Sequence, residues 1–199
     1  MEFDYKTFLG IIASIMTIWA HIPYLRDTIR GTNKPHIFTW VIWALLTFIA
    51  FAAQIKGNAG PGAWVTGITG LICVVITVAA LRNGKKDITK SDWIIFLCGL
   101  SAIPVWMATS NPLYAVIIVT LIDVSAVIPT FRKAWVKPHE ENAFMYGFNV
   151  PRHACSIAAI QSFSLLTALY PAALLFMNLA MYVMLKTRRN AISGISQPQ

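Results

Sequence analysis

The chain has 199 residues, of which 57% are hydrophobic and only 12% are charged, and its mean hydropathy is +0.62. Soluble globular proteins carry about 25% charged residues, so this composition excludes an ordinary soluble protein and indicates a membrane protein. The 16 basic and 8 acidic residues give a net charge of +8, which in a soluble chain would indicate nucleic-acid binding. In so apolar a chain, the excess of basic residues is interpreted first as a signal of membrane topology.

Apolar segments between charged clusters predict seven transmembrane helices. A spanning helix needs about 20 mostly apolar residues, so the length leaves no room for a further soluble domain. The fourth segment contains Pro104, and the sixth contains several polar residues. The sixth is retained because residues 144–186 are too long for one span and Tyr170–Pro171 offers a break. The predicted spans are 7–25, 37–55, 63–81, 93–109, 113–131, 144–163 and 167–186.

The first span is expected to be retained as a helix. Glu2 and Asp4 stand where a signal peptide would be basic, and no small-residue cleavage site follows. The odd number of cysteines, all in apolar segments, favours free thiols over disulfides or a metal site. No metal-binding, nucleotide-binding or hydrolase motif is found, so neither an enzyme nor a metal or cofactor is predicted. The cysteines are Cys73, Cys98 and Cys155.

The basic residues predict the orientation of the chain. Of the 16, only Lys6, Lys56 and Arg152 lie away from the four segments that share one side of the membrane. The positive-inside rule makes that side cytoplasmic, with the N-terminus outside and the C-terminus in the cytoplasm, in what we expect to be the plasma (inner) membrane. These cations contact anionic lipid, and no nucleic-acid partner is expected. They are Arg26, Arg30, Lys34, Arg82, Lys85, Lys86, Lys90, Arg132, Lys133, Lys137, Lys186, Arg188 and Arg189.

Short similar sequences recur at a nearly constant interval. Residues 21–26 (HIPYLR) correspond to 127–132 (VIPTFR), 34–36 (KPH) to 137–139 (KPH), and 49–54 (IAFAAQ) to 156–161 (SIAAIQ). Two copies of three helices need one extra crossing between them, so that the second copy enters the membrane in the same orientation. The predicted units are a first triple-helix bundle over 1–90, a linker helix over 91–111 and a second bundle with a short cytoplasmic tail over 112–199.

At these residues the chain resembles the PQ-loop superfamily, which includes SWEET sugar transporters, lysosomal amino-acid exporters and the KDEL receptor. The resemblance covers nearly the whole chain: seven helices, and a proline at the cytoplasmic end of helices one and five. The Gln of the family's Pro-Gln pair is replaced by Tyr24 after Pro23 and by Thr130 after Pro129. Pro129-Thr130-Phe131 is similar to the plant SWEET form. The resemblance implies an all-α membrane fold of two parallel triple-helix bundles joined by a linker helix (3+1+3).

Two opposite charges fall inside the predicted spans. Asp123 and Arg152 each lie about eight residues from the cytoplasmic side, roughly 12 Å deep in a core of about 30 Å. A charge at mid-bilayer costs about 2.5 to 3.5 kcal/mol, so the two residues are expected to pair or to line a wet cavity. Three interpretations are open: a substrate or proton-coupling site, a static bridge that fixes helix packing, and an interfacial Arg152 if the sixth helix starts after Pro151.

Further polar and aromatic residues lie near this depth. The resemblance to SWEETs implies an asparagine on the third helix of each bundle and aromatic residues on the second. Asn178 in the second bundle and Trp43 in the first bundle match this pattern. The counterpart of Asn178 in the first bundle falls near Cys73 and is not an asparagine, and the counterpart of Trp43 in the second bundle falls near Asn149 and is not aromatic. Trp43 is alternatively a packing or interface residue. A small neutral or zwitterionic solute would suit the set. The predicted substrate-binding residues are Trp43, Cys73, Asp123, Asn149, Arg152 and Asn178.

Three prolines lie near the cytoplasmic ends of predicted helices. Pro23, Pro129 and Pro151 each remove a backbone hydrogen bond, which produces a bend and a candidate hinge. The alternative is that these prolines only mark the ends of helices.

These features predict a small-solute membrane transporter of the SWEET/PQ-loop type, with alternating access around a mid-membrane polar site for a sugar, an amino acid or a similar solute. The alternative is a non-transporting receptor or interaction protein with a KDEL-receptor-like seven-helix fold. The expected partners are the lipid bilayer and the solute, and a homo-oligomer is left open.

Overall fold

The computed structural model describes residues 4–32, 35–84 and 88–195, without the side chains of residues 83, 129, 133, 140 and 193–195. Every regular element in these ranges is a helix, which confirms the all-α prediction. The α-helices are α1 (Tyr5–Ile29), α2 (Ile37–Lys56), α3 (Trp64–Asn83), α4 (Lys90–Leu100), α5 (Ala102–Thr109), α6 (Pro112–Val136), α7 (Ala143–Ala158) and α8 (Leu165–Ile195). Two short 3-10 helices, η1 (Gly60–Ala63) and η2 (Pro138–Glu140), precede α3 and α7.

Six helical segments of the described chain are long and apolar enough to cross a membrane, which agrees with the prediction of an integral membrane protein. They are α1, α2, η1 with α3, α4 with α5, α6 and α8. The predicted fourth span is divided at Ser101 into α4 and α5. The predicted sixth span, 144–163, is shorter in the structure: α7 has 16 residues, ends at Ala158 and is not among the six.

The connection between α7 and α8 corrects the break that Tyr170–Pro171 suggested. Residues 159–164 form the turn, and Pro171 lies inside α8. A proline inside a helix leaves the carbonyl four residues earlier without its backbone donor, here that of Thr167. The side chain of Gln54 on α2 supplies the missing donor, with Nε2 3.2 Å from the Thr167 oxygen. The helix therefore continues through Pro171.

Local capping explains where several helices begin. Asp4 accepts from the Lys6 N–H at α1, and Asn142 accepts from the Met145 N–H at α7. At α4, Thr89 and Asp92 form a capping box, in which each side chain accepts from the other residue's N–H. His36, which precedes α2, lies 3.9 Å from the Asp92 carboxylate and so links the starts of α2 and α4.

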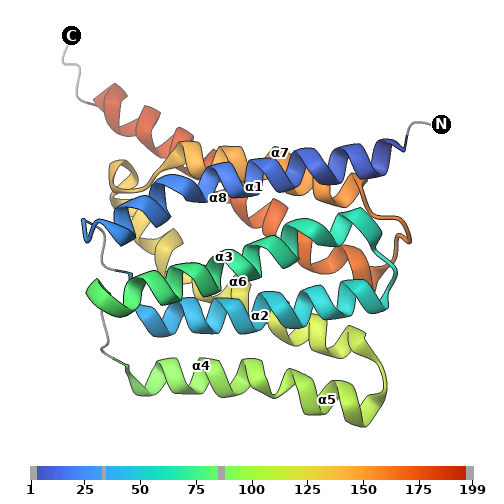
Figure 1. The fold of residues 1–199 in the computed structure, drawn as a ribbon. Helices are drawn as coiled ribbons and strands as arrows, with labels where there is room; N and C mark the ends of the chain where they lie inside the picture. Colours follow the sequence, from blue (N-terminus) through green and yellow to red (C-terminus); the bar gives the residue numbers. More distant parts are fainter. Residues whose placement is uncertain (1–3, 33–34, 85–87, 196–199) are drawn as a thin grey trace.

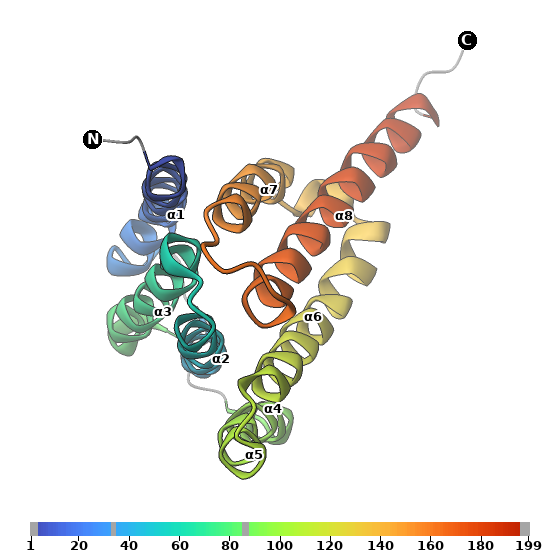
Figure 2. The ribbon, with the colours of Figure 1, turned by 90° about the vertical axis from the view of Figure 1, so that its right-hand side faces the viewer.

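The helices pack in a recurring pattern. Helix α3 contacts both α1 and α2, and α8 contacts both α6 and α7. Between these groups, α1 contacts α7 and α2 contacts α6, and α4 and α5 lie against α6 on the side of α2 (Figure 2). The main apolar core lies where α2, α6 and α8 meet and includes Leu46, Ala50, Val116, Val119 and Tyr170.

The two chain termini lie at opposite ends of the helix array (Figure 1). The C-terminus lies at the end where α1, α3 and α6 finish and where α2, α4 and α7 begin. The described basic residues of the predicted cytoplasmic side lie at or near these helix termini, and we call this the basic end. Lys34, Lys85 and Lys86 fall outside the described residues, as does the side chain of Lys133.

At the end opposite the basic end, two turns contact each other, residues 57–63 and 159–164, which we call the interlocked turns. The Gln161 N–H donates to Ala59 O at 2.9 Å, and the Ser162 N–H donates to Asn58 O at 3.1 Å. Their backbones approach so closely that a Cβ at Gly62 would lie 2.8 Å from the backbone nitrogen of Ile160. At Gly62, the two turns therefore leave no room for a side chain.

Candidate functional site

Asp123 lies near the middle of α6, partly buried, and pairs with a residue that the sequence analysis did not select. The hydroxyl of Tyr170 on α8 donates to Asp123 Oδ2 at 2.9 Å, and Tyr170 is only 2% exposed. The sequence analysis places Tyr170 at a predicted break between two helices and therefore does not identify it as a partner of Asp123. The signal in the sequence was a phenol in a strongly apolar segment, where a hydroxyl needs a polar partner.

Arg152 lies inside α7 and is only 5% exposed. Since α7 begins at Ala143, the interpretation in which the helix starts after Pro151 is wrong. The static bridge is also absent, because Arg152 and Asp123, both described, form no ion pair. Of the three guanidinium nitrogens, Nε and Nη1 have no hydrogen-bond partner, and Nη2 lies 2.9 Å from Nε2 of His153.

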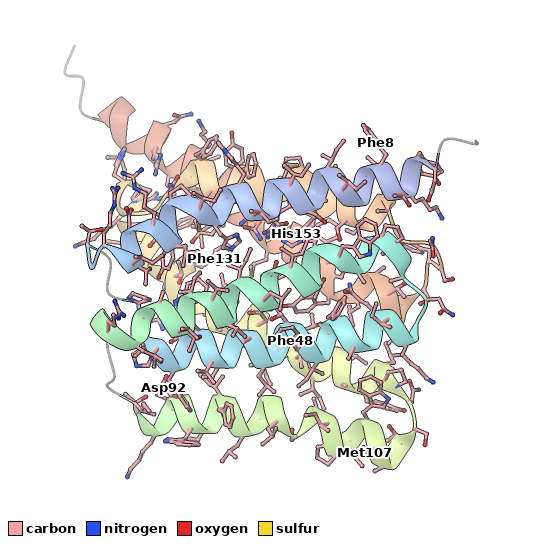
Figure 3. All side chains as sticks on the ribbon, in the orientation of Figure 1. Phe8, Phe48, Asp92, Met107, Phe131 and His153 are labelled. Atoms are coloured by element: carbon pink, nitrogen blue, oxygen red, sulfur yellow. The ribbon has the colours of Figure 1, made fainter. Side chains whose placement is uncertain are left out.

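His153 follows Arg152 and lies in the middle of the helix array, between its two ends (Figure 3). A guanidinium has no acceptor, so Nη2 of Arg152 donates and Nε2 of His153 accepts. The ring proton of the neutral histidine is therefore on Nδ1, which is buried and has no partner. His21 on α1 donates from Nδ1 to the Thr17 carbonyl at 2.7 Å.

Cys73 and Trp43 approach this region from the first three helices. Cys73 on α3 is buried and packs in an apolar cluster with Trp40, Ala44 and Ile76. Trp43 on α2 packs against the clusters around Cys73 and around Tyr170, with its ring edge-on to Trp40 at a centroid distance of 5.0 Å. Trp43 therefore packs between the cluster around Cys73 and the cluster around Tyr170.

Asn149 and Asn178 form a separate pair between α7 and α8. Asn149 Nδ2 donates to Asn178 Oδ1 at 3.0 Å, and Asn178 Nδ2 donates to the carbonyl of Leu174 at 2.7 Å. The amide of Asn178 is 4% exposed and already has a protein donor and a protein acceptor. These two residues fix the contact between α7 and α8 in this conformation.

The candidate hinge prolines lie within continuous helices. Pro23 lies inside α1 and Pro151 inside α7, and α6 runs through position 129, whose side chain is outside the described part of the chain. None of the three positions therefore ends a helix. Pro23 also borders a cavity of about 440 Å³ between α1 and α7, toward the basic end.

This cavity, which we call the α1–α7 cavity, is mostly aromatic and apolar. The rings of Trp19 and Phe148 line it and lie 5.3 Å apart. Phe148 precedes Arg152 by four residues, so the two share a face of α7 and the cavity reaches to about one helical turn from Arg152. None of the six predicted substrate-binding residues lines the cavity. Its other lining residues include Tyr24, Asp27, Asn142 and Phe144.

No group of three His, Cys, Asp or Glu side chains in the described chain is arranged to hold a metal ion. No protein-family model matches the sequence, and the comparisons with curated proteins and with solved structures gave no match.

Proposed function

We propose that the protein is a small-solute membrane transporter of the SWEET/PQ-loop type. Two triple-helix bundles, α1–α3 and α6–α8, rock against each other around a polar site, with α4 and α5 as the linker. The site is the group formed by Arg152, His153, Asp123, Tyr170 and Cys73, which we call the central polar cluster. Its solute is a small polar molecule such as a sugar or an amino acid.

The division into two equivalent bundles is supported by reciprocal contacts. The contact of α1 with α7 has its counterpart in the contact of α6 with α2, and α3 and α8 hold equivalent positions beside α1–α2 and α6–α7. Gln161 follows Gln54 by the same number of residues as Thr167 follows Gly60, so the two pairs occupy equivalent positions of the proposed repeat. Gln54 binds the backbone of Thr167, and the side chain of Gln161 lies against Gly60. Such reciprocity is expected of parallel repeats related by an axis along the membrane normal.

The observation that carries the transport proposal is the buried, incompletely paired guanidinium of Arg152. A charge without partners inside a membrane protein is costly, and charges retained at such sites usually line substrate or ion pathways. The central polar cluster draws residues from α3, α6, α7 and α8, where the two proposed bundles meet. The interlocked turns contact each other at one end, and the α1–α7 cavity lies toward the other, as in one conformation of an alternating-access cycle.

The orientation is proposed from the basic end, which the positive-inside rule assigns to the cytoplasm. We expect a fluorescent protein fused to the C-terminus to fluoresce and alkaline phosphatase fused there to be inactive, since the first reporter folds in the cytoplasm and the second only outside it. An active phosphatase fusion together with a non-fluorescent protein fusion would show that the C-terminus lies outside, which is the opposite orientation.

Transport is tested with the purified protein in liposomes and labelled sugars and amino acids. We expect solute-specific uptake that Arg152→Gln and Asp123→Asn each reduce at least 100-fold, because each change removes a charged group of the site, which is worth about 3 kcal/mol or more. Arg82→Gln, at an exposed position on α3, is the matched control and retains uptake. Wild-type uptake in both site variants would exclude the central polar cluster as the transport site.

A non-transporting receptor is the second candidate, favoured by the contact between the interlocked turns at one end. Cysteine labelling at position 178, in a variant without the native thiols, separates the two. A carrier exposes this position alternately to reagents on either side of the membrane, whereas a receptor exposes it to one side under all conditions.

A further inference from the structure

The lining of the α1–α7 cavity changes from polar to aromatic along its length. On α1, the lining residues Trp19, Pro23 and Asp27 are spaced four apart, so they form one stripe about 12 Å long. Asp27 lies in the last turn of α1, at the basic end. Helix α7 begins at the same end, where its N-cap Asn142 lines the cavity, and Phe148 lies deeper. Both helices therefore place a polar residue at the basic end and an aromatic residue farther inside.

The aromatic part of the cavity is a wall of rings from both helices, which lie side by side (Figure 2). The Phe148 ring lies 5.3 Å from that of Trp19 on α1 and 5.8 Å from that of Phe144 on α7, between centroids. Trp19 and Phe144 are 56% and 66% exposed, so a ligand in the surrounding membrane can reach them. The faces of aromatic rings attract organic cations, and tryptophan attracts them most strongly. This wall is suited to a molecule that is apolar and positively charged.

Asp27 gives the cavity a negative charge, although the cavity lies toward the basic end. Among the described residues that line it, Asp27 is the charged one. No hydrogen bond or ion pair of its carboxylate is present in the described part of the chain, and Arg26 and Arg30, its exposed neighbours on α1, do not pair with it. A carboxylate beside aromatic rings favours a cationic head, because the ion pair and the cation–π attraction then act on the same group.

We propose that the α1–α7 cavity binds an amphipathic organic cation, with its ammonium head at Asp27 and its apolar body along Trp19 and Phe148. This site goes beyond the proposed function, because it shares no residue with the central polar cluster and does not require transport. The volume of about 440 Å³ suits a drug-sized molecule or one short chain. A phospholipid is disfavoured, because its phosphate would lie beside Asp27 without a basic partner in the described lining.

A second cavity provides a comparison within the same molecule. It lies between α1, α2 and α3 and has a volume of about 470 Å³. Its lining is apolar apart from Ser14 and includes the ring of Trp64, and no charged residue of the described chain belongs to it. This cavity is expected to accept an apolar chain whatever the charge of its head. A preference for a cationic head therefore distinguishes the α1–α7 cavity from it.

The test measures binding of radiolabelled octyltrimethylammonium to the purified full-length protein in a neutral detergent. The unlabelled competitors have the same eight-carbon chain and differ in the head: octyltrimethylammonium is cationic, octanol is neutral, octanoate is anionic and octylphosphocholine is zwitterionic. We expect the cation to displace the label at a concentration about tenfold lower than the other three require. It alone brings a net positive charge to the rings and to Asp27.

Variants connect the binding to named residues, and each probe enters the detergent to the same extent whichever variant is present. Asp27→Asn is expected to weaken binding of the cation about three- to fivefold, and Asp27→Glu is expected to retain it. Trp19→Leu keeps an apolar side chain and is expected to weaken binding about 3- to 30-fold. The matched control is Trp64→Leu in the second cavity, which leaves binding unchanged. An unchanged elution profile in size-exclusion chromatography shows that each variant is folded.

The proposal is overturned if octanol or octanoate displaces the label as well as the cation does, or if folded Asp27→Asn binds as tightly as the parent. Equal losses in Trp64→Leu and Trp19→Leu also overturn it. Strongest displacement by octylphosphocholine would identify a phospholipid-headgroup site instead. None of these measurements depends on uptake into liposomes, so failure of the proposed transport leaves the cation site standing, and failure of the cation site leaves transport standing.

Discussion

Arg152→Met is expected to make the protein more stable while abolishing solute binding. Methionine has a similar length, needs no partner and removes a buried charge that has only one hydrogen-bond partner. Replacing buried ionic groups by apolar residues of similar volume is neutral or stabilises proteins by about 1 to 4 kcal/mol. The measurement is the denaturation midpoint in detergent, with binding measured on the same sample.

The matched control is Arg82→Met, which makes the same chemical change at an exposed position of α3. A surface change of this kind alters stability by about 0.5 kcal/mol or less. A loss of 3 kcal/mol or more in Arg152→Met would show instead that Arg152 belongs to a satisfied structural network, and it would remove the main support for a ligand at this residue.

Gly62→Ala is expected to weaken the contact between the interlocked turns at the end opposite the basic end. The added Cβ would lie 2.8 Å from both the backbone nitrogen and the Cα of Ile160, which move only with the whole turn. Overpacking of this kind typically costs about 1 to 3 kcal/mol. The bond from Ser156 Oγ to Gly62 O, 2.8 Å long, would be strained by the same displacement. Unfolding in detergent gives the loss of stability.

A second measurement follows the accessibility of the end where the interlocked turns meet. In Gly62→Ala, a cysteine placed at position 156 should react faster with a water-soluble reagent than in the parent, because the interlocked turns separate. Gly99→Ala is the control, since the atom nearest to its added Cβ is a methyl carbon of Leu46, 2.8 Å away, which can rotate aside. Equal stability and equal labelling in both variants would show that the turns do not depend on close backbone contact.

The hydropathy of the sequence predicted most of the helices, because helices surrounded by lipid or by protein are long segments without charged residues. The predicted spans over 7–25, 37–55 and 63–81 lie inside α1, α2 and η1 with α3. The end of α7 could not be predicted in the same way. Residues 159–164 turn because their backbone binds residues 58 and 59, which are far away in the sequence, and no local signal reports such a contact.

The sequence analysis selected three members of the central polar cluster, Cys73, Asp123 and Arg152, and it selected neither Tyr170 nor His153. Asp123 and Arg152 stand out in the sequence because opposite charges are rare in apolar segments. That Asp123 pairs with Tyr170 depends on how α6 and α8 are rotated about their axes. Residue spacing alone does not fix that rotation, so a direct Asp123–Arg152 bridge was an equally reasonable expectation.

Helices α4 and α5 cover only one of the two equivalent contacts between the proposed bundles. On the covered side, Phe38 of α2 packs against Trp93 and Phe96 of α4. On the other side, between α1 and α7, Phe144 is 66% exposed and borders the α1–α7 cavity. In a bilayer, acyl chains of phospholipids therefore solvate the α1–α7 contact and are kept from the α2–α6 contact. The length and unsaturation of the acyl chains should then affect the protein through the α1–α7 contact alone. Lipophilic molecules dissolved in the membrane would bind the protein at this same contact.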